Sequence, residues 1–292
     1  MSKVRFGPSG NEQLFYDEGN KRSVEAPRWL KAKGLSCYEY SCSRGYTISK
    51  ETAMEIGKQA VEHDILISIH APYYINLANP SQESFDNAYK YIKNGLIYLD
   101  YFQGRKLVVH TASCGKMQRE EALALVELRL KKIVEMLYEE NLIKDKLICL
   151  ETMGKFLQIG TYKEIIDLCK IDKCLIPTFD FGHINSIENG NLKTEDDYRR
   201  IFDYAISNLG LDRVKECHIH FSKIQYGKEG GEIRHLDFDD EIYGPEFKPL
   251  ANVLIEYGLT PSIICESKTR MATDAVEMKN IYNDCLKYTR QK

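Results

Sequence analysis

Histidines and carboxylates that follow short apolar runs are the residues of this chain best suited to chemistry. The run Leu175–Asp180 ends in an aspartate, and His183 follows three residues later. If this run is a buried strand, both side chains lie at its carboxyl end and can face one pocket. One Asp-x-x-His pair is weak evidence for a metal site. The indication becomes stronger because the arrangement recurs along the chain.

Six of the seven histidines share one position in the sequence pattern, at the end of an apolar run or in the loop after it, whereas His63 falls at the end of a predicted helix. Carboxylates close three of the same runs. Each residue alone could be an ordinary hydrogen-bonded structural group, but burying all of them together without a cation would be costly. The candidate metal ligands are His70, His110, Glu151, Asp180, His183, His218, His235 and Glu266, with His220 and Glu232 as further candidates.

This set of ligands indicates a particular chemistry. Neutral imidazole and carboxylate bind zinc, manganese and iron well. One zinc takes about three protein ligands, so the set predicts two or three Zn2+ ions per chain, with Mn2+ or Fe2+ as alternatives. Neighbouring metals generate hydroxide near neutral pH and stabilise the attacking and leaving oxygens of a phosphoryl displacement. Phosphodiester hydrolysis is therefore the first chemical expectation.

The elements that must position these side chains are eight short apolar runs, separated by polar loops and long amphipathic segments. Strands that alternate with helices pair in parallel through right-handed crossovers. The pattern predicts an α/β fold, a (β/α)8 TIM barrel formed by a single domain over residues 1–292, with a doubly wound open sheet as the alternative. The carboxyl ends of barrel strands converge on one face, where the candidate ligands would meet. The runs are Val4–Gly7, Cys37–Tyr40, Ile65–His70, Lys106–His110, Lys146–Glu151, Leu175–Asp180, Glu216–Phe221 and Ser262–Glu266.

Signals for the start of a helix lie between these runs, at Pro27, Ser49, Ser81, Thr161 and Thr194. Proline suits the first turn of a helix, and serine or threonine accepts hydrogen bonds from its free amides. The longest region without a regular pattern, about residues 221–246, lies between the seventh run and its helix. Loops of that length in a compact domain usually carry function.

Composition excludes several classes of protein. The hydrophobic content of 43% is ample for a large core, and the formal charge of −3 gives no global signature of nucleic-acid binding. We find neither a signal peptide nor an apolar run long enough to span a membrane. The nine cysteines form no C-x-x-C pair, which indicates reduced thiols in a cytoplasmic protein. Phosphate-binding Gly-rich loops, H-E-x-x-H and G-x-S-x-G are absent from the sequence.

The chain resembles the endonuclease IV family of apurinic/apyrimidinic endonucleases from about Ile65 to Glu266. Members of that family are (β/α)8 barrels that hold three zinc ions, and they cleave double-stranded DNA 5′ to an abasic site. The resemblance also implies a monomer and possible trimming of blocked 3′ ends. The segments that carry it are Ile69–Leu77, Val108–Thr111, Cys149–Thr152, Asp180–His183 and Ile264–Glu266.

The resemblance also implies roles for individual residues. His70, His110 and Glu151 would hold one metal, and Glu151 would bridge to a second. His183 and His235 would serve a third metal. The catalytic carboxylates would be Glu151 and Glu266, which orient a metal-bound hydroxide toward the phosphate. The second metal would also be held by Asp180, His218 and Glu266.

This chain departs from the family pattern in three places. The family has an Asp-x-His pair where Ile233 lies two residues before His235, so Glu232 or the more distant Asp237 would have to replace the aspartate. His218 and His220 are two apart and share one side of a strand; register favours His218, although His220 remains a candidate. The segment Phe6–Gly10 lacks the histidine-serine opening of the family.

Residues near the predicted site could bind DNA. The resemblance places Tyr73 and Tyr74 where they would stabilise a flipped-out abasic nucleotide, although they could equally cover the rim of the barrel. Basic side chains in loops of the same face could contact phosphates, but scattered surface lysine and arginine are also common. These basic residues are Arg44, Lys155, Lys223, Arg234, Lys268 and Arg270.

Two other functions fit the sequence. A sugar isomerase or epimerase of the xylose-isomerase-like barrels would share the carboxylates and histidines at the strand ends but would need only one or two metals. A barrel that binds metal without catalysis would follow if the lost aspartate at position 233 abolished the cluster. The excess of histidines favours the nuclease.

Overall fold

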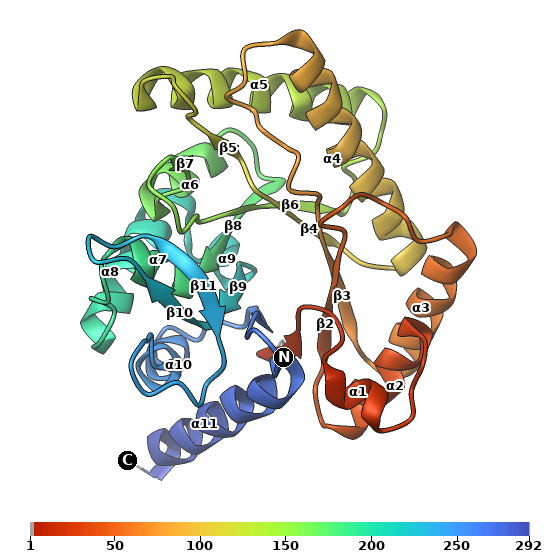
Figure 1. Cartoon of the computed structure of the whole chain (residues 1–292), viewed down its shortest axis with the longest axis vertical. Helices are drawn as coiled ribbons and strands as arrows, with labels where there is room; N and C mark the ends of the chain where they lie inside the picture. The colour runs from red at the N-terminus through yellow and green to blue at the C-terminus, as the bar shows by residue number, and fades with distance from the viewer. Residues whose placement is uncertain (1–2, 292) are drawn as a thin grey trace.

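The computed structural model describes residues 3–291, in which eight parallel strands form a nearly closed barrel surrounded by helices (Figure 1). Neighbouring strands follow the order β1-β12-β9-β8-β6-β4-β3-β2. The predicted TIM barrel is confirmed, and every predicted apolar run overlaps one strand. The strands are β1 (Arg5–Pro8), β2 (Cys37–Ser41), β3 (Leu66–His70), β4 (Lys106–Val109), β6 (Leu147–Glu151), β8 (Leu175–Asp180), β9 (His218–Phe221) and β12 (Ser262–Cys265).

The barrel closes where the first strand meets the second. The Ser36 amide donates to the Phe6 carbonyl at 2.9 Å, and the Gly10 amide donates to the Glu39 carbonyl at 3.0 Å. A Cβ atom on Gly7 would lie 1.7 Å from the Cys37 carbonyl oxygen. Only glycine permits this approach. The approach brings β2, which carries the buried Glu39, against β1.

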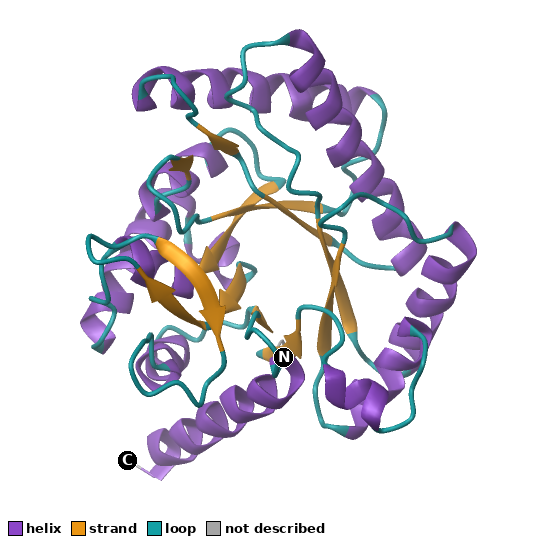
Figure 2. Cartoon of the chain, in the orientation of Figure 1, coloured by secondary structure: helices purple, strands orange, loops and turns teal. Residues whose placement is uncertain are grey.

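The helices lie outside the strands (Figure 2). Three predicted caps are confirmed: Ser49 accepts from the Thr52 amide, Ser81 from the Ser84 amide, and Thr161 from the Glu164 amide. The helices are α1 (Gln13–Asp17), α2 (Ala26–Ala32), α3 (Lys50–Glu62), α4 (Gln82–Phe102), α5 (Arg119–Glu139), α6 (Tyr162–Cys169), α7 (Phe181–Ile187), α8 (Glu195–Leu209), α9 (Leu211–Lys215), α10 (Phe247–Glu256) and α11 (Met271–Gln291), with a 3-10 turn at Ser23–Glu25.

The sequence pattern did not predict several short elements. Helices α1, α7 and α9 are one or two turns long, and β5 (Ala112–Ser113) pairs with β7 (Gln158–Ile159). The region at 221–246, predicted to be irregular, contains the antiparallel hairpin of β10 (Lys223–Tyr226) and β11 (Glu232–Leu236). Such short segments show no clear periodicity, because contacts with the rest of the protein decide their conformation.

The nine cysteines are all free and buried. Buried thiols pack as small apolar side chains. Among residues 3–291, no helix is long and apolar enough to cross a membrane.

The interior of the barrel is mostly polar toward its mouth. The small apolar cluster of Val108, Cys149 and Ile176 is separate from the main core between strands and helices. Buried polar side chains also lie on the barrel strands. They include Glu39, Ser68, His70, Glu151, Thr178, Asp180, His218 and His220. Because polar groups are costly to bury, these side chains need hydrogen-bond or ion-pair partners within the protein.

Arg129 on α5 holds the loop that follows β3. Arg129 is 8% exposed. Its guanidinium donates to the backbone carbonyls of Leu77, Asn79, Pro80 and Ser81. One buried side chain therefore satisfies four carbonyl groups of the segment that leads away from Tyr73 and Tyr74.

We predict that Arg129→Met lowers the free energy of unfolding by about 2–4 kcal/mol, because the carbonyls lose their donors. Denaturant unfolding measures the change. Lys131→Met, on the same helix but exposed and paired only with Glu127, should change stability by less than about 0.5 kcal/mol. Equal effects of the two substitutions would contradict the proposed support of the loop.

Candidate metal centre

The strand ends bring histidines and carboxylates into four groups. Within each group, every residue offers one ligand atom, and these atoms lie within 4.8 Å of one another. Three groups lie at the mouth of the barrel and contain residues predicted from the sequence. The fourth lies one layer deeper. The groups are His70, His110 and Glu151; Glu151, Asp180, His220 and Glu266; His183, Glu232 and His235; and Glu39, His218 and His220.

The first group combines the ends of three neighbouring strands. His70 Nε2 and His110 Nε2 lie 3.1 and 2.9 Å from the same oxygen, Glu151 Oε2. His70 Nδ1 lies 2.8 Å from the Ala71 carbonyl. A carbonyl can only accept, so Nδ1 carries a proton and Nε2 is the nitrogen turned toward the carboxylate. This is the arrangement that a metal-binding histidine needs.

The second group is built on the other oxygen of Glu151. His220 Nδ1 lies 3.1 Å from Glu151 Oε1, 3.5 Å from Glu266 Oε2 and 4.0 Å from Asp180 Oδ2. The sequence reading favoured His218 for this place, and the structure puts His220 there instead. Both residues face the barrel interior, but two residues advance a strand by about 6.6 Å. His218 therefore lies a layer below the carboxylates.

Asp180 shows why this group suits a cation. Its Oδ1 caps α7 by accepting from the His183 amide at 2.7 Å. Its Oδ2 is buried and has no hydrogen-bond partner among the described residues. Burial raises the pKa of Asp180, and the nearby carboxylates of Glu266 and Glu151 also raise it. A buried oxygen without a donor, beside two further carboxylates, matches the ligand set of a divalent metal.

The third group joins α7 to the β10–β11 hairpin. His183 Nδ1 lies 2.9 Å from the Thr152 carbonyl, which leaves Nε2 facing Glu232 Oε2 at 3.6 Å. His235 Nε2 lies 3.8 Å from Glu232 Oε1, and its Nδ1 lies 2.9 Å from Ser222 Oγ. Asp237 instead accepts from the Thr269 and Arg270 amides. Glu232 is thus the carboxylate brought to the place of the missing aspartate.

A β-bulge makes this possible. Gln225 pairs with Arg234, but the next residue, Tyr226, pairs with Glu232, so Ile233 is an extra residue in β11. In a regular strand, residues three apart point to opposite faces. The extra residue returns Glu232 to the face of His235, and Ile233 is left exposed. The hairpin is fixed by the Glu232 amide, which donates to the Gly154 carbonyl at 2.7 Å.

The buried carboxylates favour protonation of the neighbouring histidines. Burial opposes protonation of His70, but its hydrogen bond to Glu151 and the charge of that residue raise the pKa of His70 to about 9. Burial likewise opposes protonation of His183, and Asp180, Glu151 and Glu232 raise its pKa to about 9. A divalent cation would take the place of these protons, because a histidine binds metal in its deprotonated form.

The deeper group contains Glu39, which the sequence reading missed. Glu39 is fully buried; its Oε2 accepts from Ser68 Oγ at 2.8 Å and lies 2.9 Å from His218 Nε2. Burial alone would raise the pKa of Glu39, but His220 and His218 hold it well below its usual range. Burial lowers the pKa of His218 to about 4 despite Glu39. The available signal was a carboxylate inside the apolar run Cys37–Tyr40.

The rim carries two exposed tyrosines beside the first group. Tyr73 and Tyr74 are 57% and 60% exposed. The Tyr73 ring centre lies 5.4 Å from that of His70 and 5.0 Å from that of His110. A planar group entering the mouth could therefore stack on Tyr73 next to the candidate ligands.

The predicted basic residues differ in availability. Four are exposed and form no ion pair within residues 3–291: Arg44, Lys155, Arg234 and Lys268. Lys223 is 6% exposed and donates to the Asp240 carbonyl, with Glu246 at 2.9 Å. Its charge is thus already compensated by Glu246, and it is less available to a phosphate than the four exposed residues. Arg270 pairs with Asp239 at 2.8 Å.

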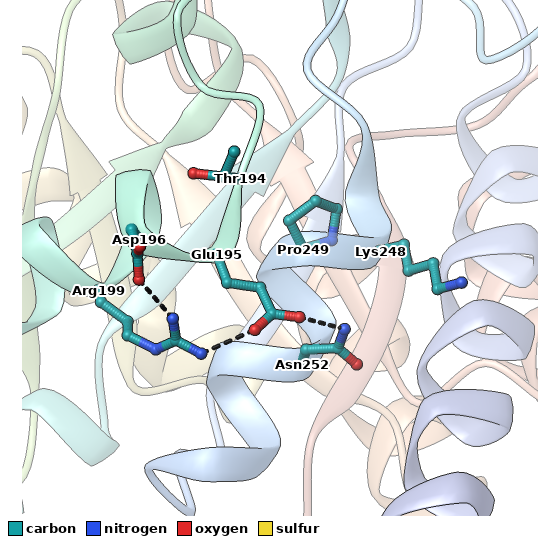
Figure 3. Close-up of a pocket in the computed structure, with 7 residues that line it drawn as sticks. All are labelled: Thr194, Glu195, Asp196, Arg199, Lys248, Pro249 and Asn252. Atoms are coloured by element: carbon teal, nitrogen blue, oxygen red, sulfur yellow. Dashed lines mark hydrogen bonds and ion pairs between the residues drawn. The ribbon is translucent and has the colours of Figure 1, made fainter.

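A separate surface hollow lies between α8 and α10 (Figure 3). Most of its polar side chains pair with one another: Arg199 with Glu195 and Asp196, and Asn252 with Glu195. Lys248 extends away from these groups in Figure 3. The hollow offers no convergent, unsatisfied polar groups and is a weaker candidate than the barrel mouth.

Relatives of this chain include proteins with different names. An uncharacterised protein of Methanocaldococcus jannaschii is 28% identical over 255 residues, which cover 87% of this chain and 90% of that protein. A probable endonuclease 4 of Methanosphaera stadtmanae is 30% identical over 177 residues, but the match spans only 59% of this chain and 60% of the relative.

Solved structures with the same fold have equally different names. A D-tagatose 3-epimerase-like protein has a TM-score of 0.67 at 22% identity and covers 88% of this chain and 90% of its own. Endonuclease IV from Thermus thermophilus has a TM-score of 0.66 at 15% identity, and the match covers 97% of this chain and 99% of that protein. The family model described as xylose isomerase-like TIM barrel matches residues 27–291. On this match, the chain belongs to the xylose isomerase-like TIM barrel family.

Proposed function

We propose that this protein is a metal-dependent phosphodiesterase of DNA repair that cleaves double-stranded DNA 5′ to abasic sites. The observation that carries the proposal is the adjacency of three ligand groups at the barrel mouth, with Glu151 in two of them. Its two oxygens face different groups, Oε2 the first and Oε1 the second. A carboxylate so placed is suited to bridge two cations.

The donor sets fit zinc, and we assign one ion to each group. His70, His110 and Glu151 would hold the first ion, Glu151, Asp180, His220 and Glu266 the second, and His183, Glu232 and His235 the third. When bound, such ions activate water and neutralise charge on a phosphate. Imidazole and carboxylate ligands also suit manganese and iron.

Glu266 and Glu151 have different roles in the proposed reaction. The Glu266 side chain is partly exposed, whereas the Glu151 side chain is 1% exposed. Glu266 can therefore meet water and orient it, or accept its proton, at the mouth. Glu151 contacts the first two groups from the barrel interior and holds them next to each other.

Features of the rim and of the relatives support DNA as the substrate. Tyr73 offers an aromatic face beside the ligands, and exposed Arg44, Lys155, Arg234 and Lys268 offer phosphate contacts. Several relatives are named probable endonuclease 4. We further propose that the protein acts as a single-domain monomer in the cytoplasm, which its nine free, buried cysteines suit, and that it also trims blocked 3′ ends.

Sugar epimerisation is the second candidate. The similar folds include epimerases, and the second ligand group alone could hold the one metal that such a reaction needs. That function leaves the first and third groups without a role. The presence of both groups is why we favour the phosphodiesterase.

Metal analysis of the purified protein, together with incision of a duplex that contains one abasic site, tests the proposal. We predict two or three zinc-type ions per chain, as the donor groups allow, and cleavage 5′ to the site. Removal of metal by a chelator should abolish incision, and added zinc should restore it. Metal without incision would favour the epimerase, and absence of metal would contradict both.

Glu266→Gln should lower the incision rate by about 10²–10⁴-fold, because it removes the base while keeping the volume of the side chain. Single-turnover cleavage measures the change. Glu229→Gln, an exposed substitution at the tip of the hairpin, serves as the control and should leave the rate unchanged. Full activity of Glu266→Gln would disprove the role given to this carboxylate.

Glu232→Gln should release one metal per chain and slow incision, because the third group loses its only carboxylate. Elemental analysis and the incision assay both report the change, with Glu229→Gln again as the control. The same substitution should leave an epimerase that depends on the second group active. Unchanged metal content would mean that Glu232 is not a ligand.

A further inference from the structure

Glu39 lies directly below the second ligand group and contacts it through one residue. Its Oε1 lies 3.0 Å from His220 Nε2, and the opposite ring nitrogen, Nδ1, faces Glu151 at 3.1 Å. The two atoms face each other at ion-pair distance, and neither Oε1 nor Nε2 has a hydrogen-bond partner among residues 3–291. Since both residues are fully buried, water cannot substitute for either partner.

We propose that Glu39 is a positioning residue that keeps the proton of His220 on Nε2 and so directs Nδ1 to the metal of the second group. A neutral imidazole carries its proton on one nitrogen and binds metal through the other. The carboxylate can only accept, so it selects the tautomer with Nε2–H. This inference rests on the proposed metal site and adds a residue that the ligand groups at the mouth do not contain.

Other histidines at the mouth support this reading. His70 and His183 each direct Nδ1 to a backbone carbonyl, of Ala71 and Thr152 respectively, at 2.8 and 2.9 Å. Each therefore turns Nε2 toward its ligand group. His220 has the reverse orientation and has a carboxylate in place of a carbonyl. A charged acceptor holds the ring more strongly and makes the ligating nitrogen more basic.

The surroundings of Glu39 favour positioning over direct metal binding. Its Oε2 already serves Ser68 and His218, and its Oε1 faces only His220. A cation on Oε1 would have to take the Nε2 of His220. The same imidazole would then bridge two cations. Pairing Glu39 Oε1 with His220 Nε2, which face each other at 3.0 Å, satisfies both buried atoms without that requirement.

Glu39→Gln tests the proposal because an amide presents one acceptor and one donor. The Gln oxygen would serve Ser68 and His218, which leaves its NH2 group facing His220 Nε2. The proton of His220 would then move to Nδ1, where it opposes metal binding. We predict that zinc affinity at one site falls about 10–100-fold, as measured by competition with a chelator, while the number of ions bound at saturation stays the same.

Ser68→Ala is the matched control. It removes a hydrogen bond from Oε2 of the same carboxylate but does not touch His220, so zinc affinity should change by less than about threefold. An equal loss in both variants would overturn the proposal, since it would show general damage to the buried polar layer. Wild-type affinity in Glu39→Gln would also overturn it. Loss of a whole ion at saturation would make Glu39 a ligand and contradict positioning.

A spectroscopic measurement on the wild-type chain does not depend on how the variants fold. In zinc-loaded protein with 15N-labelled histidine, His220 should show a protonated Nε2 and a metal-bound Nδ1, assigned by its absence in His220→Asn. The reverse pattern would overturn the inference alone. A wild-type chain that binds no zinc would instead contradict the proposed function, and the inference with it.

Discussion

The structure depends on the compensation of buried carboxylates by imidazoles inside the barrel. Five carboxylates lie in or just below the mouth: Glu39, Glu151, Asp180, Glu232 and Glu266. Uncompensated burial of so much charge would cost far more than the marginal stability of a typical protein. Each carboxylate therefore faces at least one histidine. Closure of the barrel at Gly7, the caps of the helices and the docking of the hairpin all serve to hold these pairs together.

His220 and His218 lie in different layers of the barrel interior and have different environments. His220 lies between Glu39 and Glu151 and is held from both sides. His218, one layer down, faces Glu39 alone, and burial lowers its pKa to about 4. The same strand thus supplies a neutral structural histidine and a candidate ligand two residues apart. We infer that the polar layer around Glu39 and Ser68 supports the ligand groups at the mouth.

The sequence predicted the barrel and most of the candidate site because strand ends leave a clear signal. Apolar runs that end in His70, Glu151 or Asp180 place those groups at one face of any parallel barrel. The sequence left two choices open and missed one residue. The choice of His220 over His218 depends on the depth of β9 in the barrel, and the position of Glu232 depends on a bulge at Ile233. The role of Glu39 depends on contacts between strands distant in sequence.

Membership of the family does not decide between phosphodiester hydrolysis and sugar epimerisation, because similar folds carry both names. The ligands that distinguish the two functions lie in the loops that follow the strands. The hairpin of β10 and β11 brings Glu232 and His235 to His183, and the end of β4 brings His110 to Glu151. These additions surround a four-ligand group that could work alone. On this view, His110 completes the first group with His70 and Glu151, and the hairpin residues complete the third group with His183, beside the four-ligand group.

Anomalous diffraction from crystals of the zinc-loaded protein, measured at the zinc edge, would locate the bound ions. We predict three peaks at the barrel mouth, one at each ligand group, with the first two on opposite oxygens of Glu151. A single peak, within the group of Glu151, Asp180, His220 and Glu266, would contradict the three-metal centre and favour the epimerase. Zinc bound only elsewhere on the protein would contradict the account as a whole.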